Sequence, residues 1–341
     1  MKIHFITCSS NPGKCGITDY VNLLSKELEK NGHMAEVETI DSIKDFANVS
    51  KNLPRSDLYS LQFAPYAFSQ SGLSGKGLIT FAKSLANKNT HINFHEIWIG
   101  AYPKATWKEK TIGWLQKREI INFINICKPS AITCSNSAAL DRMRQTGVDA
   151  KYLYLFGNIP YSPSKKYDSL KRLNIVFFGT LYERFPYDQL VKVLFHISQS
   201  LRKQIHIEIL GRQRDSEGLE YMKKVSQKHG FPISLSGELS ISKVSEELQR
   251  SDLGISTTPY DIIGKSGATA TMLEHSLPIL AFDDGDTPKD KLFVMDEFID
   301  QVFLLNDDST VARMISFFQK TNKSFFNGVA FTAKKMLNLH H

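Results

Sequence analysis

The sequence predicts an α/β protein made of two doubly wound domains, and three observations support this prediction. Short apolar runs rich in β-branched and aromatic residues alternate with longer amphipathic segments, as they do in βαβ units. A chain of 341 residues is long for a single core. Near residue 160 the alternation stops in a stretch rich in proline, serine and lysine, and it then starts again.

Six strands and three helices are expected in the first half. The helix at residues 18–30 carries Tyr20, Leu24 and Leu28 on one face, and Gly32 follows it as a C-cap. The predicted strands are residues 3–7, 35–39, 58–63, 91–94, 131–134 and 151–155, and the other helices are residues 105–126 and 135–146.

The second half repeats the pattern, with strands at residues 174–178, 205–210, 253–256 and 278–282. Two doubly wound domains facing each other would form a ligand cleft at the carboxyl ends of their strands. We expect domains at residues 1–160 and 173–325, a linker at 161–172, and a C-terminal helix at 326–341 that packs back on the first domain.

Composition favours a globular protein of the cytoplasm. Apolar residues make up 42% and charged residues 23% of the chain, and no run approaches the ~20 apolar residues of a membrane span. The first residues continue directly into Asn-Pro-Gly, which predicts a strand and not a signal peptide. Four cysteines without a C-x-x-C pair suggest no disulfide framework.

The net charge of +7 lies entirely in the first half. Residues 1–170 hold 21 Lys and Arg against 14 Asp and Glu, whereas residues 171–341 hold 21 of each kind. This asymmetry indicates an acidic partner for the first half, such as anionic lipid or a phosphorylated acceptor, or else a solvated surface with surplus lysine.

A glycine-bearing turn before a helix suggests an anion site in the second half. Gly264 and Gly267 allow backbone N–H groups to approach a ligand, Lys265 adds positive charge, and Ser266 can cap the helix. Glu274 lies two helical turns further along. An ordinary Gly-Ser helix start remains the alternative.

Other polar residues follow the predicted strands. Gly16 and Asp19 come after the first strand, where Asp19 is either a functional acid or a helix-capping residue. His95 follows the fourth predicted strand. It is a candidate hydrogen-bond donor to a substrate hydroxyl or a candidate acid or base, and a buried core histidine is the alternative. Tyr66 leaves the third strand as a candidate cleft wall.

Two strand-end loops of the second half carry arginine. Gly179 ends one strand and Arg184 stands five residues later, and Arg212 follows the next strand. Guanidinium groups at these positions suit a diphosphate, although single loop arginines are usually solvated.

All three tryptophans lie within one lysine-rich stretch of the basic half. Trp98 precedes a predicted helix that carries Trp107, Lys108 and Trp114. Tryptophan beside lysine suits a sugar surface or a membrane interface, and a helix with a buried aromatic face is the alternative.

These segments together resemble the two-domain GT-B glycosyltransferases. The closest resemblance is to the retaining family with an E-x7-E pattern, which includes glycogen and sucrose synthases and bacterial polysaccharide glycosyltransferases. It covers nearly the whole chain and rests on GITDY, HINFHEIWIG, AITCSNSAALDRM, VFFGTLYER and residues 259–278. The resemblance implies two Rossmann-like domains facing across a cleft, with the acceptor side in the first and the nucleotide sugar in the second.

The resemblance also implies roles for individual residues. Glu274 matches the second acid, which holds the nucleotide ribose, but Ser266 stands where the first acid is expected. The sugar and the stereochemical outcome are therefore open. Taken together, the motifs and the resemblance predict His95 and Asp19 as catalytic residues; Gly16, Gly179, Arg184, Arg212, Lys265, Ser266, Gly267 and Glu274 as donor-binding residues; and Tyr66, Trp98 and Lys108 as acceptor-side residues.

The function implied is transfer of a hexose from a UDP- or GDP-sugar to a glycan, lipid-linked or other acceptor. We expect retention, no metal or other cofactor, no nucleic-acid partner, and peripheral contact with the inner membrane face. Asp283, Asp284 and Asp286 are expected to form an acidic surface loop and not a metal site. Alternatives are a nucleotide-sugar epimerase, a phosphorylase of the same fold, and a non-catalytic binding subunit.

Overall fold

A computed structural model of the chain describes residues 1–8, 16–40, 42, 45–101, 105–163, 171–213, 217–284, 296–320 and 324–340. The chain divides into two compact units. The first comprises Met1–Leu155 together with Val329–His341, and the second comprises Phe156–Gly328.

The first unit is built on a six-stranded sheet in which every pairing is parallel. Its strand order is β2-β1-β3-β4-β5-β6, so the chain changes direction across the sheet between β1 and β3. The central strands β3 and β4 are buried along their length because helices cover both faces of the sheet. The strands are β1 Lys2–Cys8, β2 Met34–Ile40, β3 Leu58–Phe63, β4 Thr90–Phe94, β5 Ala131–Cys134 and β6 Lys151–Tyr152.

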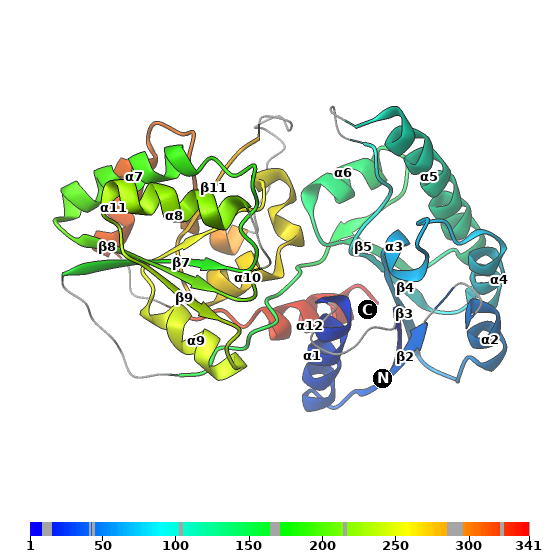
Figure 1. Cartoon of the computed structure of the whole chain (residues 1–341). Helices are drawn as coiled ribbons and strands as arrows, with labels where there is room; N and C mark the ends of the chain where they lie inside the picture. Colours follow the sequence, from blue (N-terminus) through cyan, green and yellow to red (C-terminus); the bar gives the residue numbers. More distant parts are fainter. Residues whose placement is uncertain are drawn as a thin grey trace. The chain divides into compact units, whose positions relative to one another are not determined.

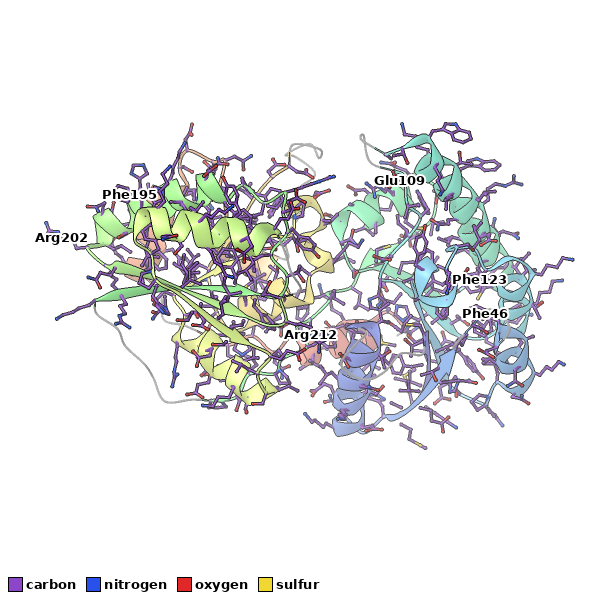
Figure 2. The ribbon with its side chains drawn as sticks, viewed as in Figure 1. Phe46, Glu109, Phe123, Phe195, Arg202 and Arg212 are labelled. Atoms are coloured by element: carbon purple, nitrogen blue, oxygen red, sulfur yellow. The ribbon has the colours of Figure 1, made fainter. Side chains whose placement is uncertain are left out.

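Helices α2, α4 and α5 cover one face of this sheet, and α1 and α12 lie on the other (Figure 1). Phe46 and Phe123 belong to the buried cluster under the first group and are labelled in Figure 2. The C-terminal helix is tied to this unit because Thr332 Oγ1 donates to the Tyr154 carbonyl at 3.1 Å. The helices are α1 Gly16–Lys30, α2 Asp45–Asn52, α3 Pro65–Phe68, α4 Gly75–Leu85, α5 Trp107–Cys127, α6 Ser137–Arg144 and α12 Gly328–Asn338.

The second unit repeats the architecture with strand order β12-β11-β10-β7-β8-β9, again with every pairing parallel. The direction in which the chain adds strands across this sheet reverses between β7 and β10, which pair with each other. The strands are β7 Arg172–Phe178, β8 Gln204–Leu210, β9 Ile233–Gly237, β10 Leu253–Ile255, β11 Ile279–Ala281 and β12 Val302–Leu304.

Helices α7, α8 and α11 form one layer on the second sheet, and α9 and α10 lie on its other side (Figure 1). Apolar side chains of α7, such as Leu190 and Leu194, are fully buried against the sheet. The elements are α7 Tyr187–Leu201, α8 Glu217–His229, α9 Ile241–Arg250, the 3-10 helix η1 Tyr260–Lys265, α10 Gly267–Glu274, the 3-10 helix η3 Asp296–Gln301 and α11 Thr310–Lys320.

Two doubly wound parallel sheets confirm the predicted fold class. The structure differs from the expectation at three strands: β6 has only two residues, while β9 and β12 were not predicted. Each of these is short, and β9 contains two serines, so none has a long apolar run to mark it.

Candidate functional site

A pocket of ≈ 270 Å³ opens where β7 and β10 end in the second unit. This is the switch point of the sheet, because the chain winds outward in opposite directions from these two neighbouring strands. Parallel open sheets bind ligands at such points. The lining residues are Phe178, Gly179, Thr180, Tyr182, Ile255, Ser256, Thr257, Thr258, Ser266, Gly267, Ala268, Thr269 and Met272.

Gly179 makes the tight turn that leaves β7. Its φ is +96°, in the left-handed region where a side chain is strained, and a Cβ there would lie 3.4 Å from the Cβ of Ala268. The Gly179 carbonyl accepts a hydrogen bond from Gln213 Nε2 at 2.7 Å, which ties the turn to the loop after β8. The backbone at the strand end is therefore held close to the first turn of α10.

The first turn of α10 faces the pocket with little side-chain cover. Ser266 is the N-cap, and its Oγ accepts hydrogen bonds from Thr269 N at 3.2 Å and Thr269 Oγ1 at 2.9 Å. A Cβ added to Gly267 would meet no atom of the described residues within 4 Å, so this position opens away from them. Helix N-termini with unpartnered N–H groups are favourable sites for anions.

Hydroxyl groups supply most of the remaining polar lining. Ser256 Oγ lies 2.9 Å from Thr269 Oγ1, and Thr257 Oγ1 donates to the Thr180 carbonyl at 2.7 Å. The described residues of this lining include no charged side chain. An anion in the pocket would be bound by backbone N–H groups, hydroxyl dipoles and the helix dipole.

Three predicted donor-binding residues, Gly179, Ser266 and Gly267, come together in the pocket. The predicted cations do not line it. Arg184 and Lys265 have exposed side chains. Arg212 forms an ion pair with Glu238 at 2.6 Å, and this carboxylate raises the pKa of the guanidinium.

Glu274 ends α10 and lies outside the pocket lining. It is 4% exposed, and its Oε1 accepts a hydrogen bond from the Gly157 N–H at 2.9 Å. The carboxylate is thus committed to a backbone partner within the second unit. Its role at a ribose stays a prediction of the resemblance.

His95 follows β4 in the first unit and is 6% exposed. Its Nε2 lies 2.9 Å from Gln62 Oε1, and the ring packs edge-on against Tyr20 with centroids 5.1 Å apart. Burial lowers the pKa of His95 to about 4, so the imidazole is neutral near pH 7. Gly16 and Asp19 lie in the first turn of α1, next to Tyr20, with Gly16 exposed and Asp19 half-buried.

The predicted acceptor-side residues occupy different environments. Trp98 is 7% exposed and belongs to the core, with Lys117 Nζ 5.5 Å from the centre of its ring. The structure thus places Trp98 inside the unit and not on a surface for an acceptor. Tyr66 on α3 is 42% exposed, and Lys108 on α5 is exposed.

Sequence reasoning missed most of the hydroxyl lining. Thr180, Thr257 and Thr258 each follow a strand within three residues, which is the signal that could have found them, while Thr269 has no distinguishing pattern. Tyr182 also lines the pocket and is 54% exposed. A strand-end position predicts proximity to the site, but the turn decides which side chains face it.

Within the described ranges, no group of three or more His, Cys, Asp or Glu residues could hold a metal ion. Asp283 and Asp284 lie at the end of a described range, and Asp286 lies outside the described residues. Among the helices that the structure describes, none has the length and apolar character needed to cross a membrane.

The sequence matches no protein-family model, and a search of curated proteins finds no similar sequence. The fold is similar to that of Anabaena HepE in complex with UDP, at 14% identity and a TM-score of 0.53, covering 98% of this chain and 94% of that one. It is also similar to the lipopolysaccharide outer core galactosyltransferase WaaB, at 13% identity and a TM-score of 0.54, covering 98% and 95%.

A third similar structure is a Listeria monocytogenes protein assigned provisionally as a UDP-N-acetylglucosamine 2-epimerase. It is 10% identical, with a TM-score of 0.54, and the match covers 99% of this chain and 95% of that one. Likeness along whole chains confirms the two-domain Rossmann-like fold that the sequence predicts.

Proposed function

We propose that this protein is a glycosyltransferase that moves a hexose from a nucleotide-diphosphate sugar, UDP- or GDP-linked, to an acceptor. The observation that carries the proposal is the pocket at the β7/β10 switch point, closed on one side by the uncovered N-terminus of α10. Two structures of similar fold, HepE with UDP and with UDP-glucose, contain ligands of this class.

The pocket suits the diphosphate part of such a donor. Whole drug-sized ligands fill pockets of about 300–1,000 Å³, so ≈ 270 Å³ accommodates a fragment of the donor. Sugar transfer develops negative charge on the leaving diphosphate, and the N–H groups and dipole of α10 would stabilise that charge. Tyr182, half exposed at the same pocket, offers a ring on which a base can stack.

Retention and metal independence are part of the proposal and follow from the resemblance. His95 is the candidate for contact with the transferred sugar, and its neutral imidazole can both donate and accept a hydrogen bond. The anomeric configuration of the product, read by NMR, tests retention, and turnover in excess EDTA tests the need for metal.

For the acceptor we propose a lipid-linked or otherwise anionic molecule at the inner membrane face, met by α5. This helix exposes two indoles, with Trp107 82% and Trp114 55% exposed, and Arg118 lies 4.8 Å from the ring of Trp114. Tryptophan with lysine or arginine on one exposed helical face is typical of interfacial helices.

Helix α5 carries a net positive charge, with four Lys and Arg against two Glu, and both acids lie at helix starts. Glu109, labelled in Figure 2, closes the capping box with Thr106, whose N–H donates to Oε2 at 2.7 Å. Glu119 accepts from the N–H groups of Ser74 and Gly75, each at 2.9 Å. The exposed cations of this helix are Lys108, Lys110, Lys117 and Arg118.

A thermal-shift panel of UDP, GDP, TDP and their sugars tests the donor assignment. A nucleotide present at 100 times its Kd adds about 2.7 kcal/mol to stability. We expect Gly267→Glu to lower nucleotide affinity at least ~10-fold, because it places a carboxylate where the open helix end would meet phosphate. Gln199→Glu, on an exposed position of α7, adds the same charge as a control.

The proposal fails if no nucleoside diphosphate stabilises the wild-type protein. Turnover of a nucleotide sugar without acceptor would identify an epimerase, the alternative favoured by the Listeria structure. Dependence on inorganic phosphate would identify a phosphorylase. If the protein binds a nucleotide but transfers sugar to no acceptor, the result would favour a non-catalytic binding subunit.

A further inference from the structure

Five polar side chains form a closed hydrogen-bonded ring inside the first sheet, and the proposed function does not use them. They are all 0–1% exposed. The strand register brings them together, because Ser60 pairs with His91, Gln62 with Asn93, and Asn93 with Thr133. Alternate residues of a strand share one face, so the ring lies on a single side of β3, β4 and β5.

Each member of the ring donates one hydrogen bond and accepts at least one. Taken in order, the Ser60 hydroxyl donates to His91 Nδ1 (3.0 Å), His91 Nε2 to Thr133 Oγ1 (2.8 Å), Thr133 Oγ1 to Asn93 Oδ1 (2.9 Å), Asn93 Nδ2 to Gln62 Oε1 (3.0 Å), and Gln62 Nε2 to Ser60 Oγ (2.9 Å). All five bonds run in one direction. Bonds arranged head to tail polarise and strengthen one another.

His95 joins this ring at Gln62. The Gln62 Nε2 amide group is committed to Ser60, so Oε1 is the atom that faces His95 Nε2 at 2.9 Å. An amide oxygen only accepts, so this 2.9 Å contact places the proton of the imidazole on Nε2. The Asn93 Nδ2 group lies further away, 3.3 Å from the same nitrogen, and donates to Gln62 Oε1 at 3.0 Å. Within the described part of the chain, the side-chain hydrogen-bond contacts of His95 all involve Nε2, which leaves the lone pair of Nδ1 for another partner.

The direction of the ring and the tautomer of His95 are linked. Reversing the direction of the five hydrogen bonds would require the side-chain amides of Gln62 and Asn93 to flip. Gln62 would then present its NH₂ group to His95, and the imidazole proton would lie on Nδ1. Both histidines must also be neutral for either arrangement. Burial lowers the pKa of His91 to about 3 and that of His95 to about 4, which satisfies this condition.

We propose that Gln62 is a positioning residue that holds His95 in the Nε2–H form, so that Nδ1 accepts a hydrogen bond from a hydroxyl of the bound sugar. The catalytic use of His95 rests on the proposed function, whereas its tautomer does not. Tyr20, edge-on to the imidazole, limits its rotation. Asn93 and Thr133 act through Gln62 by fixing the direction in which its amide lies.

Long-range ¹H–¹⁵N NMR of protein labelled with ¹⁵N-histidine reads the tautomer without substrate. We expect the wild-type His95, assigned by the loss of its signal in His95→Asn, to carry its proton on Nε2 from pH 6 to 8. Gln62→Leu removes the acceptor and should give a mixture of tautomers. Gln62→Glu keeps an acceptor and adds a negative charge, so Nε2–H should persist and His95 should titrate about 1–3 pH units higher.

Thr90→Val is the matched control, because Thr90 is buried on β4 outside the ring and its hydroxyl donates to the Lys88 carbonyl. It should leave the His95 signals unchanged. The proposal is overturned if the His95 proton of the wild type lies on Nδ1, or if His95 titrates at the same pH in Gln62→Glu as in the wild type. If Gln62→Leu does not fold, the Gln62→Glu titration alone tests the proposal. If the tautomer is as expected while His95→Asn keeps full turnover, the site assignment fails and the positioning stands.

Discussion

Glu274 joins two segments of the second unit that are far apart in sequence. Its Oε1 accepts from Gly157 N–H at 2.9 Å, and its carbonyl accepts from Phe326 N–H at 3.1 Å. A Cβ on Gly328 would lie 2.1 Å from the same Oε1, so the chain passes directly over the carboxylate. Gly157 and Gly328 are both within two residues of the points where the chain changes units.

Glu274→Ala should lower the free energy of unfolding by about 1–3 kcal/mol, since it leaves the buried Gly157 N–H without its acceptor. Glu274→Gln keeps an oxygen at that place and should cost less. Urea unfolding followed by tryptophan fluorescence measures both. A Glu274→Ala protein of normal stability that no longer binds nucleotide would instead support the ribose role implied by the resemblance.

Individual site residues were predictable only in part. Glycine and helix-cap chemistry identified Gly179, Ser266 and Gly267, because turn and N-cap positions restrict the residue type. Arg184 and Lys265 were chosen for their charge, yet their side chains are exposed outside the described pocket lining. Charge and position along the chain do not determine where a long flexible side chain points.

Among the elements, the buried strands were the most predictable. The range predicted for β3, residues 58–63, coincides with Leu58–Phe63 because a run with four apolar or aromatic residues in six lies between Asp57 and Pro65. Strand β9 was missed because ISLSG at a sheet edge is half polar. The ring on β3, β4 and β5 was missed as well, since cross-strand register cannot be read from one sequence.

Helix α5 crosses a backbone segment at Gly113, where a Cβ would lie 1.9 Å from the Ile99 carbonyl oxygen. Gly113→Ala should therefore destabilise the protein by about 1–3 kcal/mol, as overpacked sites do. Gly267→Ala is the matched control, because its Cβ meets nothing within 4 Å and a helical Gly→Ala change is otherwise neutral or stabilising. Equal melting temperatures for the two variants would contradict this account of α5.

Strand β4 makes stability depend on pH through its two buried histidines. The pKa values of His91 and His95 are lowered to about 3 and about 4, so below pH 6.5 the unfolded state binds more protons than the folded state. Stability should be full above pH 6.5 and fall towards pH 4, by up to about 1.4 kcal/mol per pH unit for each histidine.

Urea unfolding between pH 7.5 and 4.5 measures this slope. His91→Gln should be less stable overall but should show a shallower dependence on pH, because one of the two histidines is gone. His275, whose pKa burial also lowers, remains in both proteins and cancels in the comparison. Identical slopes would mean that His91 is protonated equally in both states.

At the scale of the molecule, the excess positive charge belongs to the first half of the chain, and α5 exposes part of it. Each lysine near an anionic bilayer contributes about 1 kcal/mol to binding, so loss of two costs about 2 kcal/mol, or roughly 30-fold, and reversal more. Lys108→Glu with Lys110→Glu should therefore abolish sedimentation with phosphatidylglycerol vesicles at low salt.

Lys26→Glu with Lys51→Glu makes the same change in net charge on α1 and α2 and should bind nearly as the wild type does. Equal losses in the two double variants would assign vesicle binding to net charge alone. A wild-type protein that ignores these vesicles would end the membrane proposal and leave the donor site untouched.

The chain begins and ends in the first unit, while the second is one uninterrupted stretch from Phe156 to Gly328. During synthesis on a ribosome, the second unit is therefore complete before the first has received α12. Until then the partners of that helix, such as the Tyr154 carbonyl and the face that buries Met336, stay uncovered. A nascent chain stalled before Val329 would thus present a finished second unit and a first unit still open to chaperones.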